Sequence, residues 1–184
     1  MKYTLKVAGL ERDLPLCPLN ESTMIAGFVI FGDVELTCAC AAELLKKAPE
    51  FDYMLAPEAK AIPLIHEMAR QSGCNEYLLV RKVKKLYMQN VFAVEDQSIT
   101  TQGKQMLYMD GKDAAKMKGK RILVVDDVIS SGGSISAVEH LVEQAGGIIA
   151  GRMAILAEGK AARRDDIIVL GNLPIFNAKG EPID

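Results

Sequence analysis

The 184-residue sequence lacks the signals of several common protein classes. It contains no CxxC pair, and its two histidines do not lie at zinc-ligand spacing from any of the four cysteines, Cys17, Cys38, Cys40 and Cys74. We therefore expect buried free thiols and no zinc site. The chain also has no internal repeat and no low-complexity tract.

Long apolar runs and a strong excess of one charge are also missing. The longest uncharged stretch, residues 22–32, is too short to cross a bilayer, and the first residues carry charges every few positions. With 22 basic and 24 acidic residues the formal net charge is -2, which excludes the global basic field of a dedicated nucleic-acid binder. We expect a cytoplasmic protein with no membrane or nucleic-acid partner, whose polyanion binding, if any, is local.

The composition and the order of apolar segments indicate one α/β domain. About half of the residues are apolar (49%) and a quarter are charged (25%), as in an ordinary domain with a sizeable core. A helix over 35–50, a strand at 51–56, a helix over 61–72 stopped by Gly73, and a strand at 76–82 include a βαβ unit. The sequence therefore predicts a central, mostly parallel sheet flanked by helices, with ligand-binding loops at one edge.

The second half of the chain continues this alternation after an insertion at 83–120. The insertion contains two extended arms, 91–96 and 98–109, followed by a polar run. A core strand at 122–125, a helix over 134–145 with Ser136 and Glu139 as a possible capping box, and strands at 148–156 and 167–170 complete the expected elements.

The segment VVDDVISSGGSIS, residues 124–136, joins a core strand to a helix through residues suited to a sugar phosphate. Two adjacent acids, Asp126 and Asp127, can accept hydrogen bonds from a sugar diol or bind hydrated magnesium. Glycines let backbone N–H groups approach a phosphate at a helix N-terminus, and serine hydroxyls add donors. These 5-phosphate-binding candidates are Ser130, Ser131, Gly132, Gly133 and Ser134. The segment is neither a Walker loop nor a GxGxxG turn.

This segment resembles the signature that binds 5-phosphoribosyl 1-pyrophosphate (PRPP) in type I phosphoribosyltransferases, where the usual ending is TGGT. The resemblance covers most of the chain. Its loops agree best in order and spacing with adenine and xanthine phosphoribosyltransferases and with the effector domain of the purine-operon repressor. It implies the type I phosphoribosyltransferase fold in a single domain, 1–184, to which 1–34 contribute part of a small hood and 83–120 a flexible hairpin flap.

The resemblance also implies further site residues. The pyrophosphate loop falls at Glu58, Ala59 and Lys60, with the Ala59–Lys60 bond as the candidate cis peptide. Arg81, Lys82 and Lys85 match a basic stretch that meets pyrophosphate, although a solvated basic edge explains them equally well. The flap matches Ser98, Thr100, Thr101 and Lys104, which also suit a plain exposed hairpin. The segments 26–28 and 173–176 are base-pocket candidates that core packing explains better.

The activity implied by the resemblance is the Mg²⁺-dependent transfer of phosphoribose from PRPP to a purine base, releasing pyrophosphate, in nucleotide salvage. Asp126, Asp127 and Lys60 are the expected catalytic residues, and the two aspartates are also the expected magnesium ligands, directly or through water. Adenine is the favoured base and xanthine the alternative, although the flap lacks the glutamate usual in adenine enzymes. A homodimer is implied as well. The rival hypothesis is a PRPP-sensing regulator without turnover, but roughly 20 residues before the core cannot hold a helix-turn-helix domain.

Overall fold

A five-stranded parallel sheet forms the centre of the molecule, as the computed structural model shows for residues 1–96, 105–130 and 133–183. Its strands run in the order β10 (Ile168–Leu173), β9 (Ile148–Glu158), β8 (Arg121–Ile129), β4 (Tyr53–Pro57) and β5 (Leu78–Val80). Every neighbouring pair is parallel. This confirms the predicted α/β class and the parallel sheet.

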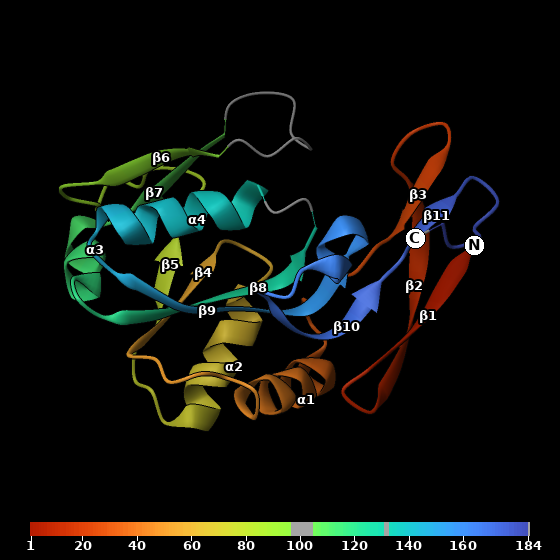
Figure 1. Ribbon diagram of the computed structural model, residues 1–184, viewed down its shortest axis with the longest axis horizontal. Coiled ribbons are helices and arrows are strands. Elements are labelled where there is room, and N and C mark those ends of the chain that lie inside the picture. Colours follow the sequence, from red (N-terminus) through yellow and green to blue (C-terminus); the bar gives the residue numbers. More distant parts are fainter. Residues whose placement is uncertain (97–104, 131–132, 184) are drawn as a thin grey trace.

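Helices cover both faces of this sheet (Figure 1). α1 (Val34–Leu45) and α2 (Ile62–Ser72) lie on one face, and α4 (Gly133–Gln144) lies on the other. Side chains of β8 alternate between two cores, because Leu123 and Val125 pack on the α1–α2 side while Ile122 and Val124 pack on the α4 side. From Ile122 to Val125 the strand is therefore apolar on both faces, and Asp126 follows directly.

The ends of the helices agree only in part with those predicted from the sequence. Gly73 ends α2, as predicted, and the structure shows it in the left-handed conformation with φ +75°. α1 ends at Leu45, before the predicted end at residue 50. The predicted capping box is wrong, because α4 already begins at Gly133, which places Ser136 inside the helix, and Glu139 instead pairs with Arg152.

Within its described residues, the insertion contains two strands, which cover most of the expected arm 91–96 and the second half of the expected arm 98–109, and a helix that was not expected. β6 (Phe92–Asp96) and β7 (Gln105–Met109) pair in antiparallel fashion and pack near α4. Backbone hydrogen bonds between Arg81 and Tyr108 tie β7 to the end of β5. The polar run that follows is α3 (Gly111–Met117), whose N-terminus is capped by the Asp110 side chain and whose Ala114 and Met117 are buried.

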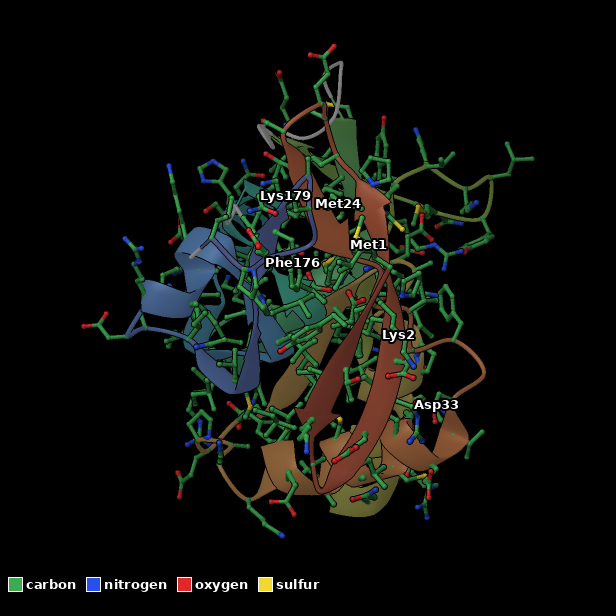
Figure 2. All side chains as sticks on the ribbon, turned by 90° about the vertical axis from the view of Figure 1, so that its right-hand side faces the viewer. Met1, Lys2, Met24, Asp33, Phe176 and Lys179 are labelled. Atoms are coloured by element: carbon green, nitrogen blue, oxygen red, sulfur yellow. The ribbon has the colours of Figure 1, made fainter. Side chains whose placement is uncertain are left out.

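A four-stranded antiparallel sheet lies beside the central domain; we call it the hood sheet. It contains β1 (Lys2–Val7), β2 (Leu10–Pro18), β3 (Thr23–Ala26) and, from the other end of the chain, β11 (Ile175–Asn177). Figure 2 looks onto this sheet, with Met1 and Phe176 close together. Leu5 and Phe176 are almost fully buried and belong to the same core as α1 and α2, which attaches the hood sheet to the central domain.

The four cysteines differ in their exposure. Cys40 is buried, but Cys38 and Cys74 are half-exposed and Cys17 is exposed, so the expectation of buried thiols holds for one of the four. The others lie on β2, on α1 and just after α2, where the chain leaves them near the surface. No helix in the described part of the chain is long and apolar enough to span a membrane.

Candidate functional site

The candidate site lies where β4, β5 and β8 end. These three strands are neighbours and parallel, so their carboxyl ends meet at one edge of the sheet, which is where α/β folds bind ligands. β4 leads into the loop at residues 58–61, β5 leads into Arg81 and Lys82, and β8 carries Asp126 and Asp127. The three segments singled out in the sequence therefore converge.

An ion pair joins the loop after β4 to β8. The Lys60 Nζ atom lies 2.7 Å from Asp127 Oδ2. Asp127 is 3% exposed, whereas the Lys60 side chain is about half exposed. A buried carboxylate is unfavourable without a counter-charge, and Lys60 supplies one.

Asp126, the neighbouring acid, has a raised pKa. Burial is the main cause that raises the pKa of Asp126 well above its usual range, and the neighbouring Asp127 carboxylate raises it further, whereas Lys60 acts in the other direction. The Asp127 backbone N–H donates a hydrogen bond of 2.8 Å to Asp126 Oδ1. Among the described residues, Lys60 is thus the one cation near both acids, which leaves the pair able to accept further hydrogen-bond donors or positive charge.

Glu58 holds the other side of the same loop. Its backbone N–H donates to the Val80 carbonyl at 2.8 Å, and its Oε1 accepts a hydrogen bond of 2.6 Å from the Lys82 backbone N–H. Its Oε2 lies 3.1 Å from Arg81 Nε. The cis peptide bond is Glu58–Ala59, so the expectation of Ala59–Lys60 is wrong by one residue.

The remaining predicted site residues that the structure describes lie on the segments that follow β5 and β8. Lys82 is exposed and Lys85 is half-buried, both on the loop after β5. Ser130 follows β8, Gly133 is the first residue of α4, and Ser134 lies in its first turn. Several predicted residues lie outside the described part of the chain: Ser131 and Gly132 of the phosphate loop and the flap residues Ser98, Thr100, Thr101 and Lys104.

The donors that could hold a metal ion are few. Among the described residues no group of three or more histidine, cysteine, aspartate or glutamate side chains converges. Asp126 and Asp127 supply hard carboxylate oxygens, the donor type that magnesium prefers. They suit a magnesium ion that obtains most of its other ligands from water and from substrate phosphate oxygens.

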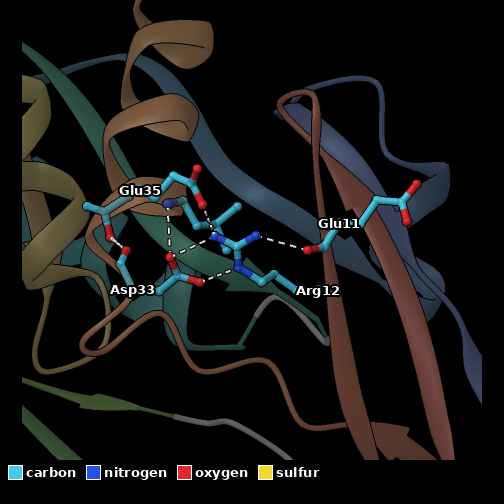
Figure 3. A network of polar contacts seen from close by, with 6 residues as sticks. Glu11, Arg12, Asp33 and Glu35 are labelled. Atoms are coloured by element: carbon cyan, nitrogen blue, oxygen red, sulfur yellow. Dashed lines mark hydrogen bonds and ion pairs between the residues drawn. The ribbon is translucent and has the colours of Figure 1, made fainter.

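A further charged cluster, which the sequence did not reveal, joins the hood sheet to α1 (Figure 3). Arg12 of β2 contacts both carboxylate oxygens of Asp33, at 2.6 and 3.1 Å, and Glu35 at 2.7 Å. Asp33 also caps α1 by accepting from the Leu36 N–H. Because 21 residues separate Arg12 from Asp33, no short-range pattern could have predicted the contact.

The base-pocket candidates lie close to this cluster. Ala26, Phe28 and Phe176 are buried in the core, as the core-packing interpretation predicts. Gly27 and Phe28 also line a cavity of about 240 Å³ beside Arg12 and Asp33. The cavity lies between the hood sheet and the start of α1.

Comparison with known families agrees with the geometry at the sheet edge. Residues 39–179 match the model of the phosphoribosyl transferase domain. The chain belongs to this family. The matched range contains the 58–61 loop, the basic residues after β5, the Asp126–Asp127 pair and the whole parallel sheet.

Individual relatives belong to the same family, and solved structures share the fold. An adenine phosphoribosyltransferase of Thermotoga petrophila is 35% identical over 59% of this chain, and the match spans 60% of that protein's length. One of Cenarchaeum symbiosum is 30% identical over 69% of this chain and 72% of its own. The fold also matches the crystal structure of adenine phosphoribosyltransferase from Thermoanaerobacter pseudethanolicus, with a TM-score of 0.68 and 23% identity over 86% of this chain and 95% of that one. This match agrees with the type I phosphoribosyltransferase fold that the sequence predicted.

Proposed function

We propose that this protein is a purine phosphoribosyltransferase, which converts adenine and PRPP to the nucleoside 5′-monophosphate and pyrophosphate in nucleotide salvage. The observation that carries the proposal is the placement of Asp126 and Asp127 near the carboxyl end of β8, shortly before α4 begins at Gly133, with Lys60 paired to Asp127. This arrangement offers acceptors for ribose hydroxyls beside donors for phosphate. The choice of adenine rests on the named relatives.

In this proposal separate groups of residues at the sheet edge bind the 5-phosphate, the ribose and the pyrophosphate of PRPP. The loop from Ser130 to Ser134 and the first N–H groups of α4 hold the 5-phosphate, because a helix N-terminus attracts anions. Asp126 and Asp127 hold the ribose hydroxyls. The cations of Lys60, Arg81, Lys82 and Lys85 offset the charge that builds on the departing pyrophosphate, and Glu58 positions Arg81 and the Lys82 backbone.

Transfer proceeds through a ribose with oxocarbenium character, so the protein acts mainly by positioning and by electrostatics. When bound with the substrate, magnesium would neutralise part of the pyrophosphate charge, and Asp126 and Asp127 would hold it directly or through water. The flap residues Ser98, Thr100, Thr101 and Lys104 remain proposed contacts that exclude water from PRPP.

A homodimer is part of the proposal. The loop after β5 exposes three large apolar side chains, Val83, Leu86 and Tyr87, of which Leu86 is fully exposed. Apolar side chains gathered in a loop beside a site are suited to contact with a second copy of the chain. Sedimentation velocity on wild type and on Leu86→Glu tests this, and a wild-type protein that sediments as a monomer at all concentrations contradicts it.

The activity test is direct. Purified protein with PRPP and magnesium is offered adenine, hypoxanthine, guanine, xanthine, uracil or orotate, and pyrophosphate release is followed. We expect release with adenine and its loss in Asp127→Ala. Release only with xanthine changes the base, whereas tight PRPP binding without release for any base favours a PRPP-sensing regulator. No PRPP binding at all overturns both.

A further inference from the structure

The Lys60–Asp127 ion pair joins two groups that the proposed function assigns to different parts of PRPP. Lys60 belongs to the pyrophosphate loop after β4, and Asp127 belongs to the ribose-binding pair on β8. Their charged atoms are 2.7 Å apart. In this arrangement the Lys60 ammonium is bound to the Asp127 carboxylate, which the proposed function assigns to the ribose hydroxyls.

Among the described residues, the Lys60 ammonium is the cation paired with the buried Asp127 carboxylate. The Asp127 side chain is 4% exposed, and its Oδ2 atom lies 2.7 Å from Lys60 Nζ. Buried polar atoms are satisfied in most native structures, so displacement of Lys60 leaves this carboxylate oxygen in need of a new donor. Ribose hydroxyls are donors of this kind.

The loop that carries Lys60 is held in place on its other side. Glu58 binds the Val80 carbonyl through its N–H and the Lys82 N–H through its carboxylate, and it also pairs with Arg81. The lysine side chain itself is 46% exposed. Release of Asp127 therefore requires only rotation of a long, flexible side chain and leaves the loop backbone in place.

We infer that the Lys60–Asp127 ion pair makes the site selective for ribose phosphates that carry pyrophosphate at C1. This rests on the proposed function. A ribose that reaches Asp127 displaces the Lys60 ammonium. PRPP offers that ammonium a new anion, its pyrophosphate, so one ion pair replaces another. Ribose 5-phosphate has no pyrophosphate at C1. Its binding therefore breaks the Lys60–Asp127 ion pair and gives Lys60 no new anion.

The inference predicts opposite effects of one substitution on two ligands. Lys60→Met keeps the length of the side chain and removes its charge. We expect ribose 5-phosphate to bind about tenfold more tightly, because no pair has to be broken, and PRPP to bind about tenfold more weakly, because the pyrophosphate loses a charged partner. The preference for PRPP over ribose 5-phosphate then falls by about a hundredfold.

Isothermal titration calorimetry with magnesium and each ligand measures these affinities. Lys60→Gln provides a second variant if Lys60→Met folds poorly. Lys46→Gln is the matched control, since Lys46 pairs with Glu43 on the surface of α1, and both of its affinities should stay at the wild-type value. Equal weakening of both ligands in the Lys60 variants, or unchanged ribose 5-phosphate binding, overturns the inference. Failure of the wild type to bind PRPP overturns the proposed function itself, and the wild-type titration alone measures it. The two failures can therefore be told apart.

Discussion

The sheet edge and the hood sheet use charged residues in different ways. At the edge, a nearly fully buried Asp127 depends on one lysine, and Asp126 has a raised pKa. In the hood sheet, the hairpin of β1 and β2 carries pairs such as Lys2–Asp13 and Lys6–Glu11, whose side chains are each about half exposed or more. Exposed pairs contribute little to stability, whereas a buried carboxylate is unfavourable for folding. Charges that are unfavourable for folding are what the proposed function expects at the sheet edge, where PRPP would bind, and the hairpin of the hood sheet has no such buried pair among its described contacts.

The strongest test removes one carboxylate from each region. Asp127→Asn preserves volume but replaces a charged acceptor with a neutral one, and charge-assisted hydrogen bonds are worth roughly 1.5–3 kcal/mol, so kcat/KM should fall about a hundredfold. Pyrophosphate release with PRPP and adenine measures the effect. The matched control is Asp13→Asn in the hood sheet, where we expect wild-type turnover. Equal losses in both variants would remove the distinction between the regions.

The second test addresses the junction between the two regions. Asp33 caps α1 and pairs with Arg12, so Asp33→Ala removes both contacts. Loss of a helix cap alone costs about 1 kcal/mol, and we expect at least that decrease in the free energy of unfolding, measured with urea. Asp13→Ala, which breaks only exposed contacts, is the control and should leave the unfolding midpoint unchanged.

Acid should weaken this junction. The hydrogen bond from Arg12 is the main cause that lowers the pKa of Asp33, and the Leu36 N–H contributes in the same direction, while burial opposes both. A carboxyl whose folded pKa is lowered contributes stability above its unfolded pKa of about 3.9, and that contribution is lost as the pH falls through the folded value. The difference between wild type and Asp33→Ala should therefore shrink below about pH 4. A difference that stays constant down to the acid transition would contradict this assignment.

The sequence predicted the parallel sheet, the end of α2 at Gly73 and the convergence of the three site segments, because each depends on local pattern or on strand order. It could not predict the contact of Arg12 with Asp33, since no regular spacing relates β2 to the start of α1. The misplaced capping box has a similar cause. Ser136 and Glu139 satisfy the pattern, but Glu139 pairs with Arg152 of β9, a partner known only from the fold.

A smaller effect of opposite sign is expected from Asp126. Its folded pKa is raised, chiefly by burial and then by Asp127, so its contribution to stability is lost as the pH rises from the unfolded pKa of about 3.9 to the raised folded pKa. Asp126→Asn should raise the melting temperature at neutral pH by roughly 2 °C for a chain of this size, and by less near pH 4. Thermal unfolding at both pH values measures this, and a destabilised variant at neutral pH would show that the charge supports the fold.

The smallest effect is expected from the exposed pairs of the hairpin. Replacing Lys2 and Lys6 together by glutamine removes both contacts, to Asp13 and Glu11, without touching the core. Ion pairs at this exposure are screened by salt and offset by the ordering of long side chains, so we expect a change in melting temperature of less than about 1 °C. Added salt should abolish even that difference. If this double variant instead destabilised the protein as much as Asp33→Ala, the charges of the hood sheet would be structural, and the sheet edge would no longer stand apart from it.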